Sequence, residues 1–456
     1  MKVGLVIGLL IVVAGLAFWV LRRSAVLPAE PLPEPPQTFL APSSVPESQC
    51  DHEVGSAVES FDGDGIAPGD VVCLLSGPRG PLSVRDVNGT VEAPVVFVNH
   101  GGTVEISGDH ETYAGIDIRS SSNLVVSGAG VVSRCGAEAD EQSCGIIIEG
   151  TGRGIAGTER TDHLSIDHVE VRSTSHSGVF IRSAAKNGTT RGDWGQEETK
   201  VEHNYIHDTG TEGLYLGSSS YAAGEDPLLR GVVVHANLVR STGWDGIQVG
   251  SAVASCSITA NRVVGAGTAN EDDQKAGIIN NRGSVCDVTG NTILGPAAQG
   301  IFVQGNGGNL IANNLVIQPG RLADQEGDGI TINRGSNTEL SITVVHNTVV
   351  AAPRSGIRFR NDVGDENLVA NNLIAAAAQP LDITIDSVRV VDNVIVRALD
   401  NGGFVDPWES DFRLTSESKA VDYGDGVGVD VDADGHRRPV GVGYDAGAFE
   451  YQEMPS

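Results

Sequence analysis

The sequence predicts an all-β solenoid, in which a chain of 456 residues coils into a stack of parallel rungs. Three observations predict this fold: a repeated strand that begins with glycine, a column of asparagines that follows it, and the composition. Glycine occurs 59 times and aromatic residues make up 5% of the chain, which suits short strands and tight turns. Solenoids grow by repetition, so this length does not require a second core.

The glycine-led strand recurs at intervals of 23 to 35 residues. Each copy alternates apolar and variable residues, which is typical of a strand with one buried face. We therefore expect the second and fourth residues after each glycine to point outwards. About ten rungs, each ~4.8 Å from the next, would follow. The leading glycines are Gly115, Gly145, Gly178, Gly213, Gly246, Gly277, Gly300, Gly329 and Gly356.

An asparagine column lags behind the glycine column within each repeat. Asparagine tolerates left-handed backbone angles at a bend, and stacked asparagine side chains form hydrogen-bonded ladders. We assign this column a structural role. Its members are Asn204, Asn237, Asn261, Asn291, Asn314, Asn347, Asn372 and Asn393.

Both ends of the repeat carry further motifs. Ala-Pro-Gly-Asp-Val-Val-Cys-Leu-Leu-Ser-Gly (67–77) precedes the first rungs, and Asp-Val-Asp-Ala-Asp-Gly-His-Arg-Arg-Pro (430–439) follows the last. With these motifs, about residues 60–451 resemble the pectate-lyase-like superfamily of right-handed parallel β-helix proteins, chondroitinase-B-type and alginate-lyase-type helices above all. The resemblance implies a right-handed coil, but the superfamily includes lyases, hydrolases, epimerases and adhesins. The Asp-Pro-His motif of alginate epimerases is absent, since Leu228 follows Asp226-Pro227.

The composition divides the chain into four parts. Residues 1–23 contain an uncharged run of 19 residues, Val3–Leu21, about the length that crosses a bilayer. We expect either one N-terminal transmembrane helix or a cleaved signal there. A proline-rich linker (24–49), the β-helix (50–400) and its C-terminal closing segment (401–456) follow. Both options place the β-helix outside the cytoplasm, in the cell envelope or secreted.

The chain has a formal net charge of −29. Nucleic acid is therefore an improbable partner, because phosphate binding needs a basic surface. Anionic lipid is disfavoured for the same reason, so we expect membrane contact through the N-terminal segment only.

Six cysteines match no zinc-ligand spacing, and an even number in an exported protein favours three disulfides. Cys256 and Cys286 each lie five residues before a column asparagine. They should therefore stack on adjacent rungs, ~4.8 Å apart, which is within disulfide range. Elimination leaves Cys135–Cys144 and Cys50–Cys73.

The widest rungs follow Gly178 and Gly213, where the insertions Lys186–Glu198 and Ser218–Arg230 lie. Long insertions usually wall the binding face of a solenoid. Histidines, carboxylates, Tyr215 and Trp244 gather on the same rungs, so we expect the functional site there. The candidate catalytic residues are His207, Glu212, Tyr215, Asp245 and Arg282. The candidate substrate-binding residues are His176, Arg182, Trp244, Gln248, Asn281, Gln304 and Arg334.

Arginine binds carboxylates through two hydrogen bonds, and aromatic rings stack on sugars. A stripe of outward arginine, amide and aromatic side chains therefore predicts a polysaccharide partner. Its alternative is a solvated sheet face whose arginines neutralise neighbouring acids. Our first hypothesis is a lyase acting on a uronic-acid polymer, with Arg182 and Arg282 neutralising the uronate and His207 or Tyr215 transferring the proton.

Two alternatives to the lyase stay open. Glu212 and Asp245 share one offset, directly before glycine, so their carboxylates should be about 5 Å apart and could serve retaining glycoside cleavage. They could also share calcium, or act as turn residues, since Asp328 repeats the offset. The second alternative is a non-catalytic adhesin or carbohydrate-binding rod.

Asp430, Asp432 and Asp434 precede Gly435 and match the start of a calcium loop. Gly441 holds the place of the expected glutamate, so a turn-rich cap over the helix end is the alternative. Calcium is the one cofactor we expect; we expect no organic cofactor.

Overall fold

The computed structural model of the chain describes residues 50–453, except for 132, 187, 323–326 and 335–339. The membrane segment and the linker predicted for residues 1–49 lie outside the described residues. Within the described part, no helix has the length and apolar character needed to cross a membrane.

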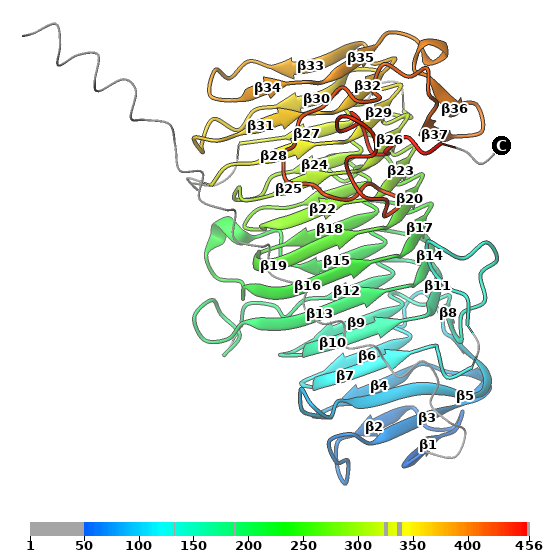
Figure 1. Cartoon of the computed structure of the whole chain (residues 1–456). Coiled ribbons are helices and arrows are strands. Elements are labelled where there is room, and N and C mark those ends of the chain that lie inside the picture. Colours follow the sequence, from blue (N-terminus) through cyan, green and yellow to red (C-terminus); the bar gives the residue numbers. More distant parts are fainter. Residues whose placement is uncertain (1–49, 132, 187, 323–326, 335–339, 454–456) are drawn as a thin grey trace, which may run out of the picture. The chain divides into compact units, whose positions relative to one another are not determined.

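The glycine-led strands form one face of the coil, a parallel sheet that we call the Gly-led sheet (Figure 1). In the described part of the chain it contains twelve strands: β2 (Ser60–Asp62), β4 (Leu82–Arg85), β6 (Ile116–Arg119), β9 (Ile155–Thr158), β12 (Val179–Ile181), β15 (Leu214–Gly217), β18 (Ile247–Gly250), β21 (Ile278–Asn280), β24 (Ile301–Val303), β27 (Ile330–Ile332), β30 (Ser355–Phe359) and β33 (Gln379–Ile383).

The other strands of the coil form two rows, joined at the first rungs by the long strands β3 (Val71–Arg79) and β5 (Val95–Ser107). The second row continues through β1 (His52–Val54), β7 (Ser122–Ser127), β10 (Asp162–Asp167), β13 (Gln196–Glu202), β16 (Leu229–His235), β19 (Ala252–Thr259), β22 (Cys286–Thr289), β25 (Leu310–Ala312), β28 (Thr343–Val345), β31 (Leu368–Ala370) and β34 (Arg389–Val391). The third row contains β8 (Ile146–Glu149), β11 (Val169–Thr174), β14 (Tyr205–Thr209), β17 (Leu238–Arg240), β20 (Arg262–Val264), β23 (Thr292–Leu294), β26 (Leu315–Ile317), β29 (Thr348–Val350), β32 (Leu373–Ala375) and β35 (Val394–Val396).

One expected rung was assigned to the wrong face. The segment after Gly145 forms β8 and pairs with β5 and β11 in the third row, not in the Gly-led sheet. The Gly-led strand of that rung is β9, which follows Gly154. Its sequence, Ile-Ala-Gly-Thr, lacks the second large apolar residue of the repeat, whereas Ile146–Glu149 has the full alternation.

The core lies inside the coil, where identical positions of successive rungs stack. Leu214 and Ile247 are adjacent in register, and both are fully buried in the core cluster. Gly213 starts its strand at the corner where the Gly-led sheet approaches the third row. A Cβ atom there would lie 2.5 Å from Cγ1 of Val239 and 2.6 Å from the carbonyl oxygen of Gly246. Steric exclusion therefore requires glycine at this corner.

The predicted asparagine ladder is confirmed. Each side-chain Nδ2 from Asn204 to Asn372 donates to Oδ1 of the next asparagine at 2.8–3.0 Å. The left-handed backbone angle, however, belongs to the residue before the asparagine: φ is 52° at Ala236 and 53° at Ala260. The asparagine itself supplies side-chain hydrogen bonds to buried backbone groups at the bend, which would otherwise lack partners.

The three predicted disulfides are confirmed. Cys256 pairs in register with Cys286, and their Cα atoms are 4.3 Å apart. The agreement confirms the rung register that the asparagine column predicts.

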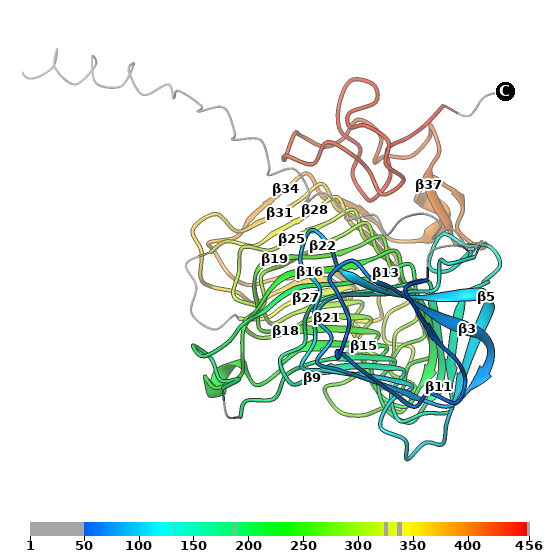
Figure 2. The ribbon, with the colours of Figure 1, turned by 90° about the horizontal axis from the view of Figure 1, so that it is seen from below.

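The C-terminal segment lies beside the coil and not over its end (Figures 1 and 2). After the short 3-10 helix η2 (Leu399–Asn401) it forms a hairpin of β36 (Phe404–Asp406) and β37 (Asp411–Leu414). Phe404, Phe412 and Ala446 pack against outward side chains of the third row, including Leu373 and Val394. The segment therefore covers this row from β23 to β35, and the alternative of a turn-rich cap over the helix end is wrong.

Candidate functional site

Tyr215 is confirmed as an outward residue of the Gly-led sheet. Its neighbours Leu214 and Leu216 are buried in the core cluster, whereas Tyr215 is half-exposed. Phe180 and Gln248 occupy the same register position on the adjacent rungs. The outer surface of this sheet is therefore the face that the sequence indicates as functional.

Arginine and aromatic side chains alternate along this face. The guanidinium of Arg153 lies 4.7 Å from the ring centroid of Tyr113 and 4.7 Å from that of Phe180. Phe180 in turn packs edge-on against Tyr215, with centroids 5.5 Å apart. We call Tyr113, Arg153, Phe180 and Tyr215 the Arg–aromatic row. Cation–π contacts hold the arginine in place, and Glu212 lies close enough for the charge of Arg153 to act on its pKa.

Two kinds of arginine occupy the Gly-led sheet. Near its C-terminal end, Arg354 and Arg360 form ion pairs with Asp328 and Asp382 respectively. These arginines neutralise neighbouring acids. Arg153 makes no ion pair with any described residue, and its Nε has no hydrogen-bond partner there. The two readings of the arginine stripe therefore apply to different rungs.

Glu212 and Asp245 lie on adjacent rungs, as predicted. The N–H of Gly213 donates to the carbonyl oxygen of Asp245, which fixes the register of the two acids. Glu212 is 3% exposed and Asp245 is 0% exposed. Burial raises the pKa of Glu212, and burial together with the charge of Glu212 raises the pKa of Asp245 well above its usual range.

Hydrogen bonds to this pair are few. The hydroxyl of Ser177 donates to Glu212 at 3.3 Å, and the N–H of Ala276 donates to Oδ1 of Asp245 at 2.7 Å. Oδ2 of Asp245 and Oε1 of the buried Gln248 have no partner among the described residues. The pair is thus closed to solvent, which argues against direct contact with a polymer.

Both long insertions pack beside this face and against each other. Arg191 of the first insertion stacks on Tyr221 of the second at 4.3 Å and donates to its carbonyl oxygen. Arg182 lies 3.8 Å from Asp226, whose carboxylate accepts a hydrogen bond from Ser218. The insertions therefore form one wall at the C-terminal ends of β12 and β15.

His207 does not lie on this face. It belongs to β14 in the third row, stacked on Tyr205 with ring centroids 4.2 Å apart. Glu170 and Asp208 accept hydrogen bonds from its two ring nitrogens. Burial alone would lower the pKa of His207, but the two carboxylates raise it. The prediction that His207 and Tyr215 share one site is therefore wrong.

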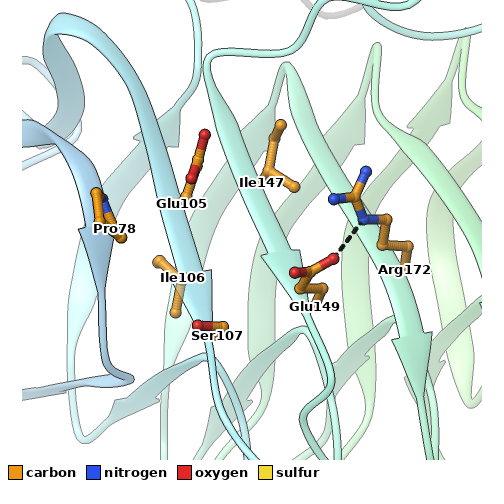
Figure 3. Close-up of a pocket in the computed structure, with 7 residues that line it drawn as sticks. All are labelled: Pro78, Glu105, Ile106, Ser107, Ile147, Glu149 and Arg172. Carbon is orange, nitrogen blue, oxygen red and sulfur yellow. Dashed lines mark hydrogen bonds and ion pairs between the residues drawn. The ribbon is translucent and has the colours of Figure 1, made fainter.

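A hollow of about 150 Å³ lies over β3, β5, β8 and β11 (Figure 3). Its charged groups are Glu105, Glu149 and Arg172, and Arg172 bonds both Glu149 and Glu170. The lining also contains Pro78, Ile106, Ser107 and Ile147. Because carboxylates outnumber the arginine, this hollow repels anions and does not suit a uronate polymer.

The remaining predicted residues are dispersed. Arg282 and His176 are exposed, and Trp244 and Gln304 are half-exposed. Asn281 is buried and accepts the N–H of Arg282, while Arg334 forms an ion pair with Asp362 at 3.0 Å. The prediction missed Tyr113 and Arg153. Arg153 precedes Gly154, so the correct assignment of that rung would have revealed it.

Asp432 is held within the C-terminal loop. Its carboxylate accepts the backbone N–H groups of Asp434, His436 and Glu450. Among the described residues, one group of histidine, cysteine and acidic side chains is close enough to hold a metal: Cys50, Cys73 and His100, whose cysteines form a disulfide. Calcium at Asp430, Asp432 and Asp434 stays a prediction.

Two family models match parts of the chain. The model described as right-handed beta helix region matches residues 276–437, and that of the periplasmic copper-binding protein NosD matches residues 189–337. None of the curated proteins matches the chain.

Solved structures share the fold at low sequence identity. Pectate lyase Pel9A is 12% identical, with a TM-score of 0.52 over 90% of this chain and 99% of that chain. An alginate lyase from Paenibacillus sp. str. FPU-7 is 14% identical, with a TM-score of 0.42 over 74% of this chain and 99% of that one. A GH136 lacto-N-biosidase from Eubacterium ramulus is 14% identical, with a TM-score of 0.48 over 76% of this chain and 68% of that one. At such identities the likeness to Pel9A shows the fold alone.

Proposed function

Because the chain is a right-handed parallel β-helix protein, we propose that it binds an acidic polysaccharide along the outer face of the Gly-led sheet and cleaves it as a lyase. The observation that carries the proposal is the Arg–aromatic row. In a chain of net charge −29, an arginine held between aromatic rings, and without an ion pair to any described residue, offers a specific site for an anionic sugar.

The row supplies the two contacts that a uronic acid needs. The rings of Tyr113 and Phe180 would stack on apolar sugar faces, and Arg153 would bind the uronate carboxylate. Arg182 follows β12 and Arg282 follows β21, three rungs apart on the same sheet, and they would bind further carboxylates along the polymer. Neutralising the carboxylate acidifies the proton on the adjacent ring carbon.

Tyr215 is the proposed proton-transfer residue, because it ends the row and its hydroxyl is within 3.2 Å of the Ser219 hydroxyl. A base removes the ring proton, the electron pair forms a carbon–carbon double bond, and the bond to the leaving sugar oxygen breaks. That oxygen then takes up a proton. Glu212 precedes the strand that carries Tyr215, and its pKa is raised. Because Glu212 is buried, we assign it no direct contact with the polymer.

The second candidate is a non-catalytic carbohydrate-binding rod that uses the same row. It would need the aromatic rings and Arg153 but not the hydroxyl group of Tyr215. The burial of Glu212 and Asp245 gives the hydrolase alternative less support. The three disulfides support a location outside the cytoplasm, since disulfides persist in oxidising compartments.

The test is product formation from a panel of uronic-acid polysaccharides. A lyase gives a product with a new double bond that absorbs ultraviolet light, whereas a hydrolase gives only a new reducing end. We expect Arg153→Ala to abolish both binding and turnover. Tyr215→Phe should abolish turnover and preserve binding.

Tyr205→Phe is the matched control, because Tyr205 is a half-exposed tyrosine of the third row. It should leave turnover unchanged. Binding without ultraviolet absorbance in the unmodified protein would favour the rod. Binding and turnover that survive Arg153→Ala would overturn the proposal.

A further inference from the structure

One of the three disulfides differs from the other two in its exposure. Cys50, which precedes β1, is half-exposed, and its partner Cys73 in β3 is 1% exposed. The four cysteines of the other two disulfides are each at most 6% exposed. A thiol reagent attacks a disulfide at a sulfur that it can reach. A dithiol in solution should therefore reduce Cys50–Cys73 before the other two disulfides.

An imidazole ring lies beside this disulfide. Nδ1 of His100, in β5, is 3.8 Å from Sγ of Cys50. This nitrogen and the two sulfurs all lie within 4.8 Å of one another. In the part of the chain that the structure describes, no second group of three histidine, cysteine or acidic residues brings its ligand atoms this close. The other two disulfides therefore have no such neighbour there.

Backbone pairing holds these three residues together at the first rungs. β1 pairs with β3, and β3 pairs with β5 (Figure 1). Cys73 lies between Val72 and Leu74 of the core cluster, so its own side chain points out of the coil. Next to Cys50, the N–H of Asp51 donates to the carbonyl oxygen of Val71. None of these contacts involves a sulfur atom, so we expect the group to stay together when the disulfide is open.

Two thiolates and one imidazole form a ligand set for zinc. Tetrahedral zinc holds sulfur at about 2.3 Å and nitrogen at about 2.0–2.1 Å, so its sulfur and nitrogen ligands lie ~3.6 Å apart. The 3.8 Å between Cys50 and His100 is close to this value. The two sulfurs would have to move to ~3.8 Å from each other. Side-chain rotation suffices for this, because the Cα atoms of Cys50 and Cys73 are 5.6 Å apart.

We propose that Cys50, Cys73 and His100 bind one Zn²⁺ ion when the disulfide is reduced. A dithiol opens the sulfur–sulfur bond by transferring two electrons and two protons to the two cysteines, and it becomes a disulfide itself. Both thiols release their protons as they bind zinc. Because Cys50 and His100 are half-exposed, water completes the tetrahedron. The ion then replaces the covalent link between Cys50 and β3.

The experiment uses the full chain in mild detergent. The protein is reduced with a dithiol under argon, the dithiol is removed, and Co²⁺ is added as a spectroscopic probe before Zn²⁺. Alkylation and mass spectrometry should find Cys50 and Cys73 free and the other four cysteines blocked. The reduced protein should bind one Co²⁺ with thiolate-to-cobalt absorption that Zn²⁺ abolishes, whereas the oxidised protein should show none. Zinc should also raise the melting temperature of the reduced protein, because it binds the folded state.

Three variants separate the ligands from other groups. His100→Ala should raise the dissociation constant for Zn²⁺ more than about tenfold, because it removes one of three protein ligands. Its melting temperature without metal should stay near that of the unmodified protein, since His100 is half-exposed. His110→Ala is the matched control, because His110 is an exposed histidine outside the group. The double variant Cys50→Ala, Cys73→Ala keeps the other two disulfides and should bind no ion.

Reduced protein that shows no thiolate-to-cobalt absorption would overturn the proposal. Equal zinc binding by the oxidised protein would do the same, since the sulfurs would then not be ligands. A folded His100→Ala variant that binds zinc as tightly as the unmodified chain would also overturn it. So would alkylation that finds another cysteine pair free before Cys50 and Cys73.

Discussion

At the scale of single residues, the rung on which a buried aspartate lies decides whether its negative charge is compensated. Asp245 and Asp328 both precede a glycine of the Gly-led sheet and both are 0% exposed. Asp328 accepts hydrogen bonds from Arg354, Thr331 and the N–H of Ser355. Asp245 has one such partner and faces Glu212. The same residue at the same offset is therefore a compensated anion on one rung and a poorly solvated acid on another.

Stability should depend on pH through Asp245. Because its pKa is raised in the folded state, the folded chain holds a proton that the unfolded chain releases. The free energy of unfolding therefore falls as pH rises from the ordinary aspartate pKa towards the raised value. Asp245→Asn stays neutral and can still accept the N–H of Ala276. We expect its melting temperature to match that of the unmodified protein near the ordinary aspartate pKa of about 4 and to exceed it increasingly as the pH rises above that value.

Asp62→Asn is the control, since Asp62 is an exposed residue of β2. Its melting temperature should follow that of the unmodified protein at each pH. An Asp245→Asn curve parallel to the unmodified one would show that Asp245 is already ionised in the folded state.

At this scale the sequence predicts which way a side chain points better than it predicts how far that side chain is buried. Alternation after glycine places Tyr215 correctly on the outer face. It does not predict that Gln248, its register neighbour, is 2% exposed. The loop before β21 returns to the start of β18, where Gly267 donates to the carbonyl oxygen of Trp244. Such contacts between turns depend on loop conformation, which periodicity does not encode.

At the scale of elements, the asparagine ladder is the most regular feature. Oδ1 of Asn291 accepts both N–H and Nδ2 of Asn261, and its Nδ2 donates to Asn314 and to the carbonyl oxygen of Ile258. All of these groups are buried. The side chain of Asn291 therefore provides hydrogen-bond partners for groups on both neighbouring rungs.

Asn291→Ala should lower the free energy of unfolding by at least about 3 kcal/mol, because it leaves several buried polar groups unpaired at ~1–3 kcal/mol each. Asn393→Ala removes the half-buried last member of the ladder, where water can replace the lost bonds. Its cost should be about 1 kcal/mol. Denaturant unfolding of both variants measures the difference. Equal losses would mean that the ladder does not act through burial.

Elements were predictable wherever the repeat was complete. The asparagine column and Cys256–Cys286 defined the register of the later rungs. The rung of β8 and β9 was misassigned because two glycine-led segments, after Gly145 and Gly154, compete within one turn. A strand of four residues carries too little pattern to resolve that choice. The error hid Arg153, the central residue of the candidate site.

At the scale of the whole molecule, the chain covers part of its own surface. The C-terminal segment packs on the third row from β23 to β35, while the earlier strands of that row stay open. Its position beside the coil was not predictable from the Asp430–Gly435 motif, because a turn-rich sequence gives no information about what it packs against. The contact depends on apolar packing and on hydrogen bonds that coil side chains such as Asn313, His346 and Asn371 make with backbone groups of the segment.

Arg438 holds the segment together and makes one hydrogen bond to the coil. It forms an ion pair with Glu450 at 2.8 Å, with both side chains 0% exposed, and donates to Asn313 at the second corner of the coil. Burial lowers the pKa of Arg438 and raises that of Glu450. A buried pair of this kind is costly to break, because the remaining charge lacks compensation.

Arg438→Met should therefore destabilise the fold of the segment by about 3–5 kcal/mol, because Glu450 stays buried without its partner, and so release the segment from the coil. The apolar side chains of β26, β29 and β32 would become exposed, so limited proteolysis should cut within residues 404–453 and a hydrophobic dye should bind. The coil itself should stay folded, because its core cluster does not include the segment. Arg437→Met changes the adjacent, exposed arginine and should stay resistant to protease. Equal resistance of Arg438→Met would mean that apolar packing alone holds the segment in place.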